Sequence, residues 1–75
     1  MKKDLTERET QVLRLVAEGC TAEEIGVRLK ISFHTAKTHV RRVCLKLGAN
    51  DRASAVHQGH IAGYLTAQGS RRVHP

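Results

Sequence analysis

Apolar residues recur three or four positions apart along most of the chain, which is the spacing of one face of an α-helix. The clearest run is Ala36, Val40, Val43 and Leu47, which makes a narrow apolar stripe. Comparable sets lie within residues 12–16 and 22–29, and no segment alternates as a half-buried strand does. The pattern predicts an all-α fold, a four-helix bundle with helices at about 6–18, 21–29, 33–47 and 51–62.

Capping residues stand where these helices are expected to begin. The pairs Thr6 with Glu9 and Thr21 with Glu24 have the spacing of capping boxes. Ser32 and Asp51 are good N-caps for the third and fourth helices, and a glycine follows the first, third and fourth. The second and third helices are therefore separated only by a tight turn, which is typical of a helix-turn-helix.

Two residues near this turn are expected to destabilise the fold slightly through their backbone conformation. Gly26 lies inside the second helix, where glycine costs about 1 kcal/mol relative to alanine, so we expect another helix to cross closely there. Lys30 stands where a left-handed conformation is needed, which costs a non-glycine residue roughly 1 kcal/mol.

Charge is distributed unevenly along the 75 residues. Residues 1–24 hold four basic and six acidic side chains, whereas residues 25–75 hold nine basic and one acidic, within a net charge of +6. Such a basic portion indicates a polyanionic partner, although basic surface also serves solubility. The chain is too short for a deep catalytic pocket with a rigid shell, and it has no apolar run long enough to span a membrane.

The third predicted helix contains no acidic residue and has a basic outer side. Lysine and arginine bind phosphates and guanine edges, and threonine contacts either thymine methyl groups or polar base edges. Helix starts at residues 21 and 32 add backbone N–H donors for phosphates. The DNA-binding residues predicted on these grounds are Thr21, Ser32, His34, Lys37, Thr38, Arg41, Arg42 and Lys46.

Several separated blocks resemble the LuxR/GerE-type helix-turn-helix domain of bacterial transcription regulators. They lie within residues 5–65: LTERE at 5–9, VLRLVAEG at 12–19, TAKTHV at 35–40, KLG at 46–48, DRA at 51–53 and GYL at 63–65. In the LuxR/GerE family, this domain usually lies at the carboxyl end of a longer chain, after a sensor or receiver domain. No such domain precedes the motif here, so the resemblance fits either a fragment or a stand-alone regulator.

The resemblance implies a role for two helices. It places the third helix in the major groove, with Lys37, Thr38 and Arg41 at bases or nearby phosphates and with Thr35 and His39 at the DNA backbone. For His39, capping of a neighbouring carbonyl is the alternative. The resemblance also implies that the fourth helix pairs with its twin in a homodimer, at least on DNA, with half-sites about one helical turn apart.

The expected dimer contacts are the small and apolar residues of the fourth helix, Ala55, Val56, Gly59 and Ala62. Packing of this stripe against the first helix of the same chain is the alternative. Leu45 departs from the family pattern, because a basic or polar residue is usual there. An exposed leucine at that position suggests a contact with another protein or a second domain.

Other chemistry has little support. Cys20 and Cys44 fall on separate elements, and His57 with His60 lacks a C-x2-C partner motif, so we expect reduced thiols, no metal and no cofactor. Ser54 and Asp51 are explained as surface and capping residues, so we expect no enzyme.

The sequence thus predicts a sequence-specific regulator acting on double-stranded DNA in the cytoplasm, at the nucleoid. Residues 1–65 are expected to form the domain, and residues 66–75 a flexible basic tail. The alternative is a protein-interaction module that pairs with a full-length regulator, or docks on RNA polymerase, without reading DNA itself.

Overall fold

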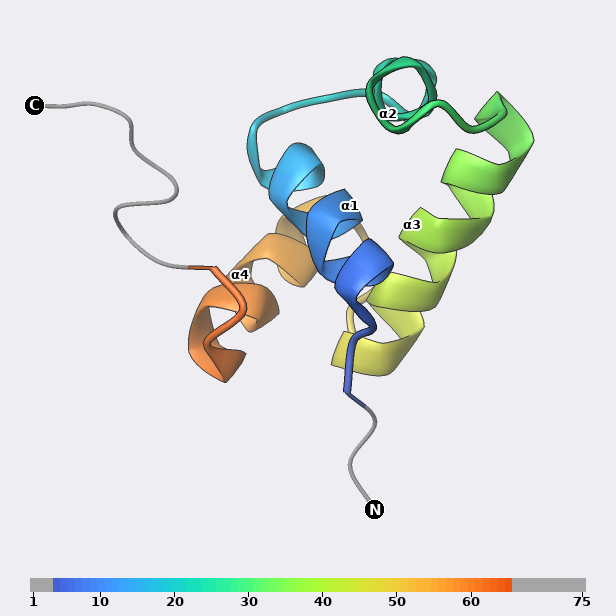
Figure 1. Ribbon diagram of the computed structural model, residues 1–75. Helices are drawn as coiled ribbons and strands as arrows, with labels where there is room; N and C mark the ends of the chain where they lie inside the picture. The colour runs from blue at the N-terminus through green and yellow to red at the C-terminus, as the bar shows by residue number, and fades with distance from the viewer. Residues whose placement is uncertain (1–3, 66–75) are drawn as a thin grey trace, which may run out of the picture.

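The computed structural model describes residues 4–65, which fold into four α-helices in the predicted order. These are α1 (Glu7–Ala17), α2 (Ala22–Leu29), α3 (Phe33–Leu47) and α4 (Arg52–Ala62). In Figure 1, α1 lies in the middle, α3 runs down the right side, α2 crosses above and α4 lies at the lower left. The predicted all-α class and helix positions are confirmed to within a residue or two at each end.

The predicted caps form in all four helices. Thr6 and Thr21 each accept a hydrogen bond from the backbone N–H of the glutamate three residues on, and that glutamate accepts one from the cap's own N–H. Ser32 and Asp51 cap α3 and α4 in the same way through their side chains. The helix starts are therefore defined by hydrogen bonds between residues three positions apart.

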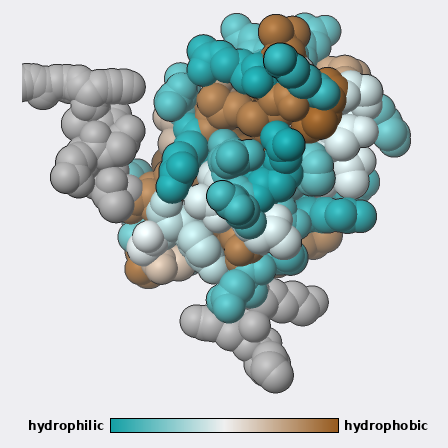
Figure 2. Space-filling model, viewed as in Figure 1, coloured by the Kyte–Doolittle hydropathy of each residue, from teal (hydrophilic) through white to brown (hydrophobic). Residues whose placement is uncertain are grey.

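The core lies where α1 meets the other helices. Its largest fully buried side chains are Val12 and Leu13 from α1, Ile25 from α2 and Val43 from α3. The α3 helix packs against α1 and α2, and α4 packs against α1 and α3. Figure 2 shows polar residues over most of one face, with apolar surface visible between α1 and α2.

The turn between α2 and α3 has the strained geometry predicted for it. Lys30 adopts φ 60° and ψ 45°, which is the left-handed region and costs a lysine roughly 1 kcal/mol. At Gly26 the structure gives a different reason for the glycine from the expected helix crossing, because the nearest atoms belong to the turn at Ile31 and Ser32. A Cβ at Gly26 would lie 2.8 Å from the carbonyl oxygen of Ile31, so the turn itself requires the glycine.

A buried ion pair joins the start of α1 to the end of α3. Lys46 Nζ lies 2.7 Å from Glu9 Oε1 and also donates to the Asp4 carbonyl at 3.2 Å. The same carboxylate oxygen accepts the backbone N–H of Thr6 at 2.9 Å, so the α1 cap and the interhelical bond share one group. Burial alone would raise the pKa of Glu9, but the Lys46 ammonium and the Thr6 N–H together lower it below its ordinary value.

This pair should make stability depend on pH. Because the pKa of Glu9 is lowered by folding, its contribution is present above the ordinary value near 4.5 and is lost as pH falls through the folded value. We expect Glu9→Gln to cost about 1–3 kcal/mol near neutral pH, with the gap to wild type closing in acid. Urea unfolding across a pH series measures both effects.

Glu18→Gln is the matched control. The Glu18–Arg28 pair is longer, at 3.6 Å, and its side chains are 41% and 57% exposed. Its loss should change stability by less than about 1 kcal/mol. A gap between Glu9→Gln and wild type that stays constant down to strong acid would contradict the assigned role.

A second prediction concerns the turn. Gly26→Ala gains helix propensity worth about 1 kcal/mol but forces the new methyl group against the Ile31 carbonyl. Since that atom is backbone, we expect a net loss of about 1–3 kcal/mol by urea unfolding. Stabilisation by this substitution would show that the turn moves freely.

Candidate nucleic-acid interface

The outward side of α3 presents cationic and polar side chains to solvent. His34, Lys37, Arg41 and Arg42 are exposed, and Thr38 is partly exposed. Ala36 and Val43 on the opposite side are buried in the core. One stripe of the helix thus anchors it, and the other side is left free for a ligand.

The cations on this side remain unpaired within the fold. Among the ion pairs formed by residues 4–65, none involves Lys37, Arg41 or Arg42. Lys37 Nζ instead lies 5.3 Å from the centre of the Phe33 ring, one turn earlier on the same helix. A cation–π contact of this kind holds the amine without neutralising it, so its charge stays available to a polyanion.

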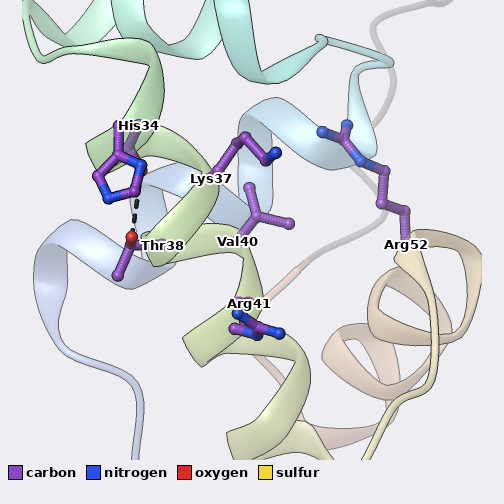
Figure 3. A pocket seen from close by; sticks show the side chains of 6 residues that line it. All are labelled: His34, Lys37, Thr38, Val40, Arg41 and Arg52. Atoms are coloured by element: carbon purple, nitrogen blue, oxygen red, sulfur yellow. Dashed lines mark hydrogen bonds between the residues drawn. The ribbon is translucent and has the colours of Figure 1, made fainter.

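A hollow of about 460 Å³ opens beside these residues. Its lining comes from α3 and from the first residue of α4, as Figure 3 shows: His34, Lys37, Thr38, Val40, Arg41 and Arg52. Thr38 Oγ1 donates to the His34 carbonyl at 3.1 Å, which fixes the hydroxyl on the helix. The hollow combines one apolar residue, Val40, with cationic and hydroxyl groups and contains no carboxylate.

Arg52 was missing from the predicted site residues. It follows the α4 cap in sequence, so its position beside α3 is set by the tertiary fold. The sequence offered two signals: Arg52 is a cation beyond the helix-turn-helix, and it lies in the DRA block at 51–53 that resembles the family. Neither signal assigns its side chain to the surface beside α3.

Lys46 does not belong with the other predicted contacts. Its ammonium is bound to Glu9 and to the Asp4 carbonyl, and its side chain is only 25% exposed. The expectation treated it as an outward cation. In the fold, the end of α3 faces the start of α1, so the Lys46 ammonium pairs with Glu9 of the same chain.

The remaining predicted residues surround the exposed side. Ser32 Oγ accepts the Thr35 N–H at 3.0 Å and donates to the Thr35 hydroxyl at 2.9 Å, so both are engaged in the α3 cap. Thr21 caps α2 and is exposed. His39 is partly buried, and its Nδ1 is buried with no hydrogen-bond partner in the described structure, so that atom caps no carbonyl.

Leu45 is 72% exposed, as expected. It follows His34, Thr38 and Arg41 at steps of four, three and four residues, so it continues the same helix side. An apolar side chain thus extends the cationic side rather than forming a separate patch.

The α4 residues expected at a dimer contact are divided by the fold. Ala55 is 2% exposed and Gly59 is buried; a Cβ on Gly59 would lie 2.7 Å from Leu13 Cδ2. Gly59 thus packs against α1 of the same chain, which was the alternative, and Ala55 is part of the hydrophobic core. Val56 stays partly exposed and Ala62 exposed, next to Ile61, which is 66% exposed.

Groups suited to catalysis or metal binding are used otherwise. Burial raises the pKa of the Cys44 thiol, which disfavours the reactive thiolate form. The backbone and side-chain hydrogen bonds from Ser54 lower the pKa of Asp51, whose carboxylate caps α4. Across residues 4–65, no three histidine, cysteine or acidic side chains gather as metal ligands, and none of the helices is long and apolar enough to cross a membrane.

Known proteins are similar to this chain in sequence and in fold. The family model described as "GerE: Bacterial regulatory proteins, luxR family" matches residues 3–58. The transcriptional regulatory protein LiaR of Bacillus subtilis is 42% identical over 62 residues, covering 79% of this chain and 29% of LiaR. The response regulator protein VraR of Staphylococcus aureus is 44% identical over 52 residues, covering 69% of this chain and 25% of VraR.

The architecture is shared as well. A structure titled "Structure of Transcription factor, GerE" superposes with a TM-score of 0.77 at 31% identity, covering 83% of this chain and 92% of that one. This chain spans less than a third of the length of the curated relatives just named.

Proposed function

The chain belongs to the luxR family of bacterial regulatory proteins, a family of non-enzymatic helix-turn-helix domains that bind DNA, and on that premise we propose that it reads specific sites in double-stranded DNA with α3. One observation carries the proposal: the exposed side of α3 holds cations that no carboxylate of the described chain neutralises. An α-helix of this kind fits the major groove.

In the proposed complex, Lys37, Thr38 and Arg41 contact base edges or adjacent phosphates. Their side chains lie together along the hollow, so they meet one short run of base pairs. Arg42 points to one side and binds a phosphate. The caps at Thr21, Ser32 and Thr35, together with His34 and His39, position the DNA backbone around the helix.

We also propose that two copies bind neighbouring half-sites through α4. Because Ala55 and Gly59 are buried, the proposed contact is left to the accessible apolar residues of α4, Val56, Ile61 and Ala62, of which Ile61 is an exposed large side chain. Residues 1–65 act as the DNA-binding domain, in the cytoplasm at the nucleoid. The basic tail expected at residues 66–75 lies outside the described residues.

A protein-interaction module remains the second candidate, and the exposure of Leu45 favours it. In that case α3 binds a full-length regulator or RNA polymerase instead of DNA. Fluorescence anisotropy with random-sequence duplexes at moderate salt separates the two, because a DNA-binding domain binds them weakly and a protein-only module does not bind them.

The Lys37→Ala, Arg41→Ala double variant tests the DNA-reading side. We first select bound sites from a random duplex pool, then measure binding by gel shift and helicity by circular dichroism. The double variant should lose specific binding and keep its helicity, because neither side chain packs in the core. Wild-type binding should weaken with salt at a log–log slope of about −0.9 per neutralised phosphate.

The matched control is Arg8→Ala with Arg14→Ala, which removes the same charge from exposed positions on α1. It should bind the selected site at close to the wild-type concentration. If the Lys37, Arg41 variant binds as tightly as this control, α3 is not the reading helix.

Ile61→Lys tests the proposed dimer. A charge on the outward side of α4 should leave binding to a single half-site unchanged and remove cooperative binding to a paired site. Val27→Lys introduces the same change at an apolar α2 residue that is 79% exposed, and it should keep cooperativity. Gel shifts on single and paired half-sites measure both, and cooperative binding by Ile61→Lys would place the dimer contact elsewhere.

A further inference from the structure

Arg52 ties two parts of the fold together and still presents charge to solvent. Its Nη1 donates to the Cys20 carbonyl at 2.7 Å, which joins the start of α4 to the connection between α1 and α2. A guanidinium has five N–H donors in a rigid plane, and this bond uses one of them. Within the described residues Arg52 forms no ion pair.

The bond holds the guanidinium at the hollow beside α3. Figure 3 shows Arg52 across the hollow from Lys37 and Arg41, which project from successive turns of α3. The positively charged side chains of Lys37, Arg41 and Arg52 thus line one hollow of about 460 Å³. None of the described residues that line this hollow is acidic. The nearest carboxylate in sequence, Asp51, accepts the Ser54 N–H at 2.8 Å and does not line the hollow.

This arrangement favours an anion. Like charges that converge without a counter-charge repel one another, and a ligand that neutralises them gains that energy. A guanidinium matches the oxygens of a phosphate by paired hydrogen bonds, and a neighbouring lysine adds a point charge. Val40 adds an apolar surface to the hollow, against which the sugar ring next to a phosphate can pack.

We propose that the hollow binds a phosphate group. Arg52 is the anchoring residue, and Lys37 or Arg41 contacts the same phosphate from the α3 side. The inference rests on the proposed function, because the phosphate is assigned to the DNA backbone next to the major groove. Arg52 thereby contacts DNA from outside the helix-turn-helix, and its bond to Cys20 presets its orientation. A free phosphate offers the same chemistry, and the experiment distinguishes the two sources.

Arg52→Gln is the main test, because it removes the charge and keeps a polar side chain; its amide is shorter than the guanidinium that bonds the Cys20 carbonyl, so folding of the variant is measured alongside. Binding to the selected duplex and to random duplexes should weaken to a similar degree, since a phosphate contact carries no base information. The log–log salt slope should become less negative by about 0.9. Arg8→Gln, an exposed arginine on α1, should leave affinity and slope at wild-type values.

A folded Arg52→Gln variant, judged by circular dichroism and urea unfolding, with wild-type slope and affinity overturns the proposal. The proposed function would survive that result if the Lys37, Arg41 variant still lost specific binding. If the Lys37, Arg41 variant bound normally while Arg52→Gln did not, the proposed function would fail instead.

A measurement on the wild-type protein covers the case in which Arg52→Gln does not fold. The side-chain Nε–H signals of arginine are followed by NMR during titration with the selected duplex and, separately, with inorganic phosphate. The Arg52 signal should shift with duplex and stay in place at millimolar phosphate. A shift with phosphate alone assigns the site to a free anion and contradicts the DNA assignment, and no shift with either ligand excludes the site.

Discussion

The α3 helix packs one side into the core and presents the other side to solvent, and the rest of the structure is arranged around that constraint. Its apolar stripe is narrow and contains small residues such as Ala36, so α1 and α2 must approach it closely. Burial of this stripe turns that side of α3 toward the core. The Ser32 cap and the left-handed Gly48 set the two ends of the helix, and the Lys46–Glu9 pair joins its last turn to the start of α1.

The fold separates the cations of α3 and its surroundings into two groups. In the first group, Lys46 pairs with Glu9, and Arg28 pairs with Glu18 at the surface. Lys37, Arg41 and Arg42 stay free of carboxylates within the described residues. Since unneutralised cations attract a polyanion, the available positive charge of α3 is concentrated on its solvent-facing side.

The fourth helix shows how a small domain uses its glycines for packing. Gly59 faces Leu13 and Leu65 so closely that a methyl group would collide with both, and Ala55 is buried beside it. In a chain of this size little apolar surface is available for the core, so the small residues of α4 are needed inside. Of the large apolar side chains of α4, Ile61 is then the one left exposed.

The sequence by itself determined the helices, because capping boxes, glycine stops and helical periodicity act over three or four residues. It predicted the strain at Lys30 and the exposed cations Lys37 and Arg41 for the same reason. Only the tertiary structure decided the partners: Lys46 with Glu9 across 37 positions, Arg52 with Cys20 across 32, and Gly59 against Leu13. Such pairings depend on how helices pack, which local periodicity does not encode, so a lysine that binds a carboxylate and one that faces solvent look alike in the sequence.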